Sequence, residues 1–163
     1  MTLTFGEIER PGPWTGYIQA MDQALSEGGP RDSVCAWRQA YSAALSYPGW
    51  SGLLIVAAAA LRLRVFASLA QSAAAHARET YWIAFFRARQ QRSLDGVLYA
   101  AEAFAQLGDR SSVEQCLRCA EALAARAGDS AEAERVRLHA ARLAELTIDA
   151  ERSGVVSAGA ENV

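Results

Sequence analysis

Apolar residues recur along this chain at intervals of three and four positions, which is the spacing of one face of an α-helix. The alternation of apolar and polar residues that is typical of strands is almost absent. Glycine, proline and capping residues interrupt the helical pattern at short intervals. The pattern predicts an all-α fold, with helices over residues 15–26, 34–46, 52–64, 67–92, 94–107, 111–127 and 130–152.

Local signals predict how these helices begin and end. The fourth helix is either continuous or broken near Thr80, and Gly108 is expected to form the turn after the fifth. Serine and aspartate side chains can accept hydrogen bonds from the first free N–H groups of a helix. The expected N-caps are Asp32 and Ser33 for the second helix, Ser51 for the third, Ser93 for the fifth and Ser111 or Ser112 for the sixth.

The same pattern divides the chain into three parts. Residues 1–16 precede the periodic region and are expected to be an N-terminal extension. Residues 17–152 carry the periodicity and are expected to form one helical domain. Residues 153–163 contain no aromatic residue and little periodicity, so we expect a disordered tail.

The helices show signs of a repeat with a period of 34 residues. Ala36, Ala40 and Ala43 map onto Ala70, Ala74 and Ala77 at this offset. The best single unit covers residues 94–127, where small, aromatic and turn positions follow one another in order. These positions are Ala101, Phe104, Gly108, Val113, Leu117 and Ala120.

In this unit the chain resembles the tetratricopeptide repeat (TPR) family. Small side chains at Ala101 and Ala120 would let two helices approach closely, and Phe104 and Leu117 would fill the space between them. The resemblance implies stacked antiparallel helix pairs, with about three repeats and a closing C-terminal helix.

Members of this family hold a peptide or helix of another protein on a concave face lined by the first helix of each repeat. The resemblance therefore implies a non-enzymatic protein-binding module. The chain has no Lys and its single Asn is Asn162, which argues against the subfamily that clamps a terminal carboxylate. A partner segment that is apolar or amphipathic fits better. The implied partner-binding residues are Ile55, Ala59, Arg62, Leu98, Glu102 and Gln106.

Length and layout are also similar to the TPR-class chaperones of bacterial type III secretion, which hold aggregation-prone translocator proteins and often dimerise. This similarity implies a chaperone role and a homodimer.

An aromatic segment interrupts the repeat at residues 81–89 and becomes basic at its end. It can be a contact surface for a partner, or it can be the core between the second and third repeats. The residues concerned are Tyr81, Trp82, Phe85 and Phe86.

The composition narrows the range of functions. The chain contains 35 Ala and 16 Arg but no Lys, and its net charge is −2. The near-neutral charge argues against a nucleic-acid partner, and the missing lysine excludes a P-loop and a Schiff-base lysine. Arginine without lysine suggests a GC-rich, bacterial genome.

Charge is unevenly distributed along the chain. Residues 33–92 contain seven Arg and one acidic residue, a net of +6, whereas residues 93–163 carry −5 and residues 1–32 carry −3. The opposite charges can neutralise one another within the fold or within a dimer. Alternatively, the basic middle of the chain receives an acidic or amphipathic partner.

Groups that could carry chemistry are few, and no metal or cofactor is expected. Cys116 and Cys119 fall inside a helix, where they are expected to fill space. Ser72, His76 and Glu79 share one helical face, which is read as a solvated stripe. His139 is read as a surface residue. The alternatives to a binding module are a structural oligomer subunit and a helical enzyme that uses His76 or Cys116.

Three cysteines are few, and an odd number cannot all pair in disulfides, so a disulfide framework is not expected. A reduced, cytoplasmic protein is expected instead. The first ten residues do not have the pattern of a secretory signal. The most apolar run, residues 53–61, is far shorter than the roughly 20 residues of a membrane span.

Overall fold

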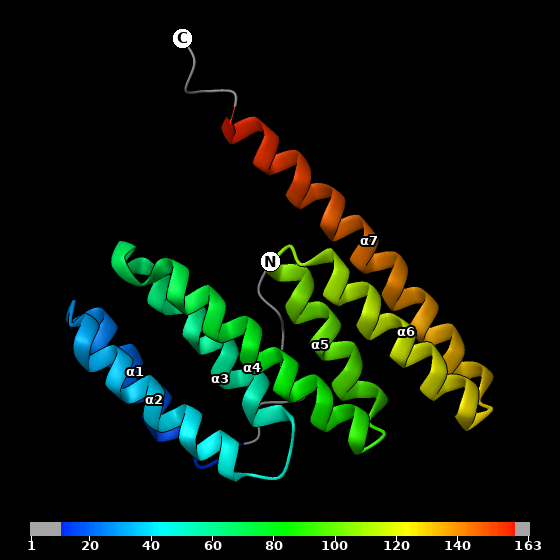
Figure 1. The fold of residues 1–163 in the computed structure, drawn as a ribbon, viewed down its shortest axis with the longest axis horizontal. Coiled ribbons are helices and arrows are strands. Elements are labelled where there is room, and N and C mark those ends of the chain that lie inside the picture. The colour runs from blue at the N-terminus through cyan, green and yellow to red at the C-terminus, as the bar shows by residue number, and fades with distance from the viewer. Residues whose placement is uncertain (1–10, 159–163) are drawn as a thin grey trace. The chain divides into compact units, whose positions relative to one another are not determined.

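The computed structural model describes the backbone of residues 11–158 and the side chains of residues 11–146. The described residues form α-helices and two short 3-10 turns but no strand, so the prediction of an all-α fold is confirmed (Figure 1). The helices are α1 (Thr15–Ser26), α2 (Pro30–Ser46), α3 (Ser51–Arg62), α4 (Ala70–Gln90), α5 (Leu94–Gln106), α6 (Arg110–Ala127) and α7 (Ser130–Ala158). The turns are η1 (Leu63–Val65) and η2 (Ala67–Leu69), between α3 and α4.

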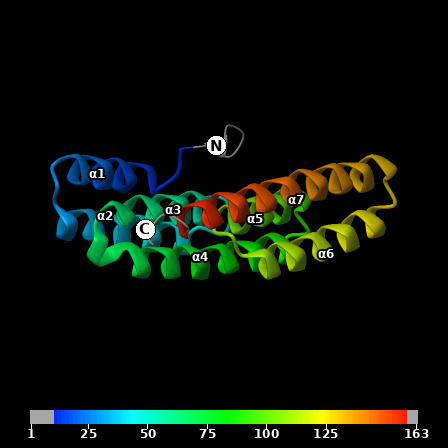
Figure 2. The same cartoon turned by 90° about the horizontal axis from the view of Figure 1, so that it is seen from above.

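The chain forms two compact units, Met1–Gly96 and Val97–Val163, and the boundary falls in the first turn of α5. In the first unit, α1 packs against α2, α2 against α3, and α3 against α4. In the second unit, α6 packs against α7, and Figures 1 and 2 show the first part of α7 alongside α6 and its end extending beyond it. Packing between helices that follow one another in the chain is compatible with a helical repeat.

The first, fifth and seventh helices begin as predicted, whereas the other helices begin at different residues. Helix α2 starts at Pro30 rather than at the predicted Val34, because proline lacks the N–H that a first helical residue leaves unpaired. Ser33 therefore lies inside the helix, where its buried hydroxyl donates to Gly29 O at 2.7 Å. Ser51 is likewise the first residue of α3 and not its cap.

The N-cap of α6 is Asp109, and not Ser111 or Ser112 as predicted. The Asp109 carboxylate accepts a hydrogen bond from Ser112 N at 3.3 Å. Asp109 directly follows Gly108, whose φ of +70° ends α5 in the left-handed conformation. Gly108 therefore forms the turn that the sequence predicted, and it also sets where α6 can begin.

Helix α4 is continuous through Thr80. The Thr80 hydroxyl is buried and donates to His76 O at 2.7 Å, so the helix itself supplies its partner. At the other end of the chain, the backbone of α7 is helical to Ala158, beyond the predicted end at Arg152. Of the predicted tail, residues 159–163 lie outside the described residues.

Alanine and glycine let the helices of each unit approach closely. Ala57 on α3 and Ala77 on α4 are completely buried in the first unit. A Cβ atom added to Gly52 would lie 2.5 Å from the Trp14 ring. In the second unit, Ala101 and Ala120 are completely buried, as is the Phe104 ring. Much of the unusual alanine content thus serves helix packing.

Candidate partner-binding surface

Three of the predicted partner-binding residues lie on α3, in the first unit, and only one of them is exposed. Ile55 is half-buried, and Ala59 is 1% exposed and belongs to the core. Arg62 is exposed, and its Nε lies 3.2 Å from Asp22 Oδ1 on α1. A fully buried alanine cannot contact a partner, so the prediction for Ala59 is wrong.

The other three predicted residues lie on α5, in the second unit. Leu98 is 2% exposed and lies in the core, and Gln106 is exposed. Glu102 is buried, forms an ion pair with Arg142 of α7, and has its Oε1 near His139 of the same helix. Glu102 therefore stabilises the second unit, and neither Glu102 nor the buried Leu98 is exposed to a partner.

His139 is not the surface residue that the sequence suggested. Its Nε2 lies 2.7 Å from Glu102 Oε1, and its side chain is only 18% exposed. Burial lowers the pKa of His139, and the positive charge of Arg135, one turn earlier on α7, lowers it further. The Glu102 carboxylate also meets Arg142, so it is already partly neutralised.

The aromatic segment on α4 divides between core and surface. Tyr81 and Phe85 are almost completely buried, and burial raises the pKa of the Tyr81 hydroxyl. Phe86 is 52% exposed and stacks on Trp82, with ring centroids 5.7 Å apart. The inner face of this helix therefore belongs to the core, as one of the two alternatives predicted. Phe86 is on the exposed side, where it is accessible to a partner.

On the face of α4 that carries Ser72, His76 and Glu79, the Ser72 hydroxyl does not donate to the imidazole of His76, the contact that would activate a serine. The Ser72 hydroxyl donates to Leu69 O at 3.0 Å, and His76 Nδ1 lies 2.7 Å from the Ser72 carbonyl oxygen. The imidazole of His76 packs edge-on against Trp37, with centroids 5.4 Å apart. The hydroxyl and the imidazole are thus both engaged with other groups.

Cys116 is buried, and burial raises the pKa of its thiol to about 12, with a further contribution from Cys119. Reactive thiols have pKa values shifted in the opposite direction. Within the described residues, no group of three or more His, Cys, Asp or Glu side chains is placed to hold a metal ion.

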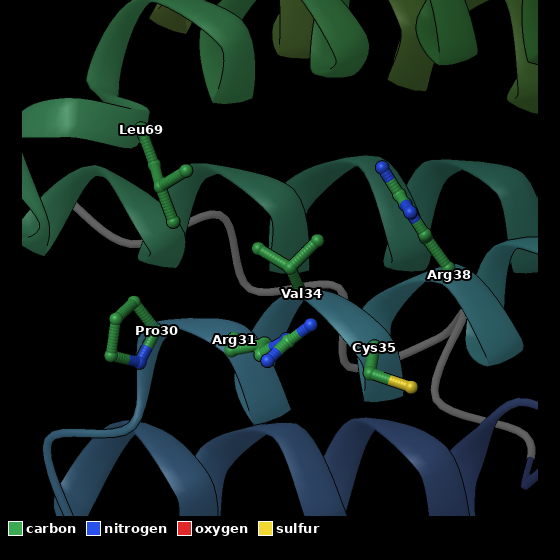
Figure 3. A pocket seen from close by; sticks show the side chains of 6 residues that line it. All are labelled: Pro30, Arg31, Val34, Cys35, Arg38 and Leu69. Carbon is green, nitrogen blue, oxygen red and sulfur yellow. The ribbon is translucent and has the colours of Figure 1, made fainter.

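A hollow lies along the first half of α2, among residues that are not among the predicted partner-binding residues (Figure 3). Its volume is about 390 Å³. Val34 and Leu69 point into it from α2 and η2, and Arg31 and Arg38 flank Val34. The side chains that line the hollow are Pro30, Arg31, Val34, Cys35, Arg38 and Leu69.

The five lining residues on α2 share one helical face, a signal that the sequence contains, whereas the contribution of Leu69 depends on how η2 packs. Arg31 and Arg38 are exposed, and neither side chain forms an ion pair or hydrogen bond with another described residue. The hollow is therefore apolar at its floor and positively charged at both ends.

The arginines of the basic segment, residues 33–92, have different environments. Arg87 reaches from α4 to the carbonyl groups at the end of α2 and is structural. Arg64, Arg89 and Arg92, like Arg38, are exposed, and their side chains are unpaired among the described residues. Most of the local positive charge is thus available at the surface.

The fold defines an all-α protein whose neighbouring helices pack in pairs, compatible with a helical repeat. Compared with models of known protein families and with curated proteins, the chain matches none of them. Within the described residues, no helix has both the length and the apolar character required to cross a membrane.

Proposed function

We propose that this chain is a non-enzymatic protein-interaction module, arranged like a TPR protein, that binds an acidic and amphipathic segment of a partner. The observation that carries the proposal is a set of exposed arginines on the first unit whose side chains have no ion-pair or hydrogen-bond partner among the described residues: Arg31, Arg38, Arg64, Arg89 and Arg92. All of these arginines except Arg31 lie in residues 33–92, where Glu79 is the single acidic side chain, so this segment cannot neutralise them itself.

Apolar groups lie on the same unit as these arginines. Val65 in η1 is 72% exposed and Phe86 on α4 is 52% exposed. A surface that combines guanidinium groups with apolar side chains is suited to a partner that carries carboxylates and apolar residues. Electrostatic attraction of this kind raises the association rate and weakens with salt.

The proposal is tested with a fluorescent, acidic amphipathic peptide, titrated with the full chain and followed by fluorescence anisotropy. Replacing Arg38, Arg64 and Arg89 together by Gln is expected to weaken binding about tenfold, and more at low salt. The matched control replaces Arg110 and Arg137, which are exposed arginines of the second unit paired with Glu114 and Glu134.

Equal binding of the charge-inverted peptide, or equal loss in the control variant, would refute the proposal. Self-association is the competing outcome, because the net charge of −5 over residues 93–163 could neutralise the basic segment of a second copy. Light scattering separates the two: a concentration-dependent dimer that excludes the peptide would favour a structural subunit.

A narrower form of the proposal is that the chain acts as a chaperone, like the TPR-class chaperones of type III secretion that it resembles. It then predicts that an aggregation-prone partner remains in solution when co-expressed with the chain and precipitates with the triple arginine variant. A partner that binds but precipitates equally with both proteins would restrict the function to that of an adaptor.

A further inference from the structure

We infer that the hollow along α2 is the docking site for an amphipathic helix whose carboxylates are seven residues apart. This inference rests on the proposed function and specifies the site and the chemistry of the partner. It starts from the spacing of Arg31 and Arg38 on α2. Seven residues are almost two helical turns, so the two side chains leave the same face about 10 Å apart along the axis.

The space between the two arginines is apolar. Val34 on α2 and Leu69 in η2 face it, Pro30 closes one end, and the exposed Cys35 lies beside Val34 (Figure 3). A volume of about 390 Å³ is near the lower end for ligand pockets and suits a few apolar side chains. The hollow therefore accommodates anchor residues of a segment that lies along α2.

The charges at the two ends specify the rest of the partner. Arg31 and Arg38 have no counter-ion among the described residues. The neighbouring acid, Asp32, is in the first turn of α2, where the positive end of the helix dipole stabilises it. A guanidinium group binds a carboxylate through two parallel hydrogen bonds, so each arginine can take one acidic side chain.

A helix is the occupant that matches both features at once. A single small carboxylate would neutralise one arginine and leave the other unpaired across the apolar space. A partner helix along α2 has the same rise per residue, so glutamates at positions i and i+7 come opposite Arg31 and Arg38. Leucines at i+3 and i+4 then lie over Val34 and Leu69.

Cys35 provides a direct measurement of occupancy. The thiol is exposed and lines the hollow, whereas Cys116 is buried elsewhere in the chain. The probe is a helical peptide with Glu at i and i+7 and Leu at i+3 and i+4. Maleimide modification of the full chain, followed by mass spectrometry of the peptides that contain each cysteine, is expected to slow about tenfold at Cys35 when the peptide is saturating.

Two controls make the result specific. A peptide of equal composition with Glu at i and i+5 is expected to bind about tenfold more weakly and to protect Cys35 less. The variant with Arg31→Gln and Arg38→Gln is expected to lose about tenfold in affinity for the first peptide, and Arg64→Gln with Arg89→Gln to lose less. All four side chains are exposed and have no partner within the part of the chain that the structure describes, so the fold is expected to be retained.

The outcomes separate this inference from the proposed function. If the first peptide binds but neither protects Cys35 nor depends on Arg31 and Arg38, the hollow is not the site and the proposed function stands. If the two peptides bind equally, the seven-residue register is wrong. If no acidic amphipathic peptide binds, the proposed function fails as well. If Cys35 becomes protected as the protein concentration rises in the absence of any peptide, the occupant is a second copy of the chain. This result would overturn the inference.

Discussion

The guanidinium group of Arg87 on α4 donates a hydrogen bond to the carbonyl oxygen of Leu45 at the end of α2, at 2.8 Å from Nη2. The last carbonyl groups of a helix have no partner within it, and the negative end of the helix dipole attracts a cation. Arg87 also donates to Gly49 O at 3.3 Å, and Gln91 donates to Pro48 O at 2.7 Å. Helix α4 thus caps α2, to which it is not directly connected.

Replacing Arg87 by Ala is expected to lower the free energy of unfolding by about 2 kcal/mol, because several carbonyl groups lose a charged donor. The change is measured by urea unfolding. Arg89→Ala is the matched control: that side chain is exposed and unpaired among the described residues, so a change within about 0.5 kcal/mol is expected. Equal effects of both substitutions would contradict the capping role.

Gly16 and Gly52 are each the second residue of a helix, but their surroundings differ. A Cβ atom on Gly16 would meet nothing within 4 Å, whereas one on Gly52 would lie 2.5 Å from the Trp14 ring. Gly16→Ala is therefore expected to stabilise the fold by up to about 0.5 kcal/mol. Gly52→Ala is expected to destabilise it by about 1–3 kcal/mol through overpacking. Thermal unfolding of the two variants checks the difference in sign.

The burial of His139 beside Glu102 predicts a pH dependence of stability. Burial and Arg135 lower the pKa of His139 in the folded chain. The unfolded chain, with a histidine pKa of about 6.5, therefore takes up the proton first as the pH falls. The free energy of unfolding decreases below about pH 6.5, until the pH falls below the folded pKa.

Urea unfolding between about pH 8 and about pH 5.5 measures this effect, and His139→Gln is expected to reduce the slope. Arg135→Ala removes one cause of the lowered pKa and is expected to reduce the slope in part. The charged groups known to face this histidine are Glu102 from α5 and Arg135 and Arg142 from α7. An unchanged slope in His139→Gln would assign the pH dependence to other groups.

The cysteines are expected to differ strongly in reactivity. Cys35 is exposed, whereas Cys116 is buried and its thiol has a pKa of about 12. A maleimide should therefore modify Cys35 rapidly in the folded chain, and Cys116 only as fast as the second unit opens. Mass spectrometry after short exposure distinguishes the two sites. Rapid modification of Cys116 would show that its thiol is accessible in solution.

The helices that the sequence predicted most accurately are those whose ends depend on neighbouring residues. Helix α1 has the predicted limits, because Gly28 follows its C-cap Glu27 in a left-handed conformation, and Gly108 forms the turn predicted after α5. The start of α6 was misplaced because three capping residues stand close together, Asp109, Ser111 and Ser112. Only the position of the Gly108 turn selects Asp109 among them.

The candidate site was much less predictable from the sequence. Helical periodicity places Ala59 and Leu98 on one face of their helices, but it does not show whether another helix covers that face. Glu102 looked available because its partners, His139 and Arg142, are far away in the sequence. The face of α2 with Arg31, Val34 and Arg38 was readable, but the floor contributed by Leu69 was not.

The type and order of the helices follow from the sequence alone, because hydrophobic spacing, glycine turns and proline act over a few residues. The burial of each helical face, the partner of each charge and the position of the hollow follow from tertiary packing. These depend on contacts between segments that are distant in the chain, such as Arg87 with the end of α2 and Leu69 beside Val34. No local pattern encodes such contacts, since an arginine can equally well bind a carbonyl group or face solvent, and a leucine can lie in the core or line a surface hollow.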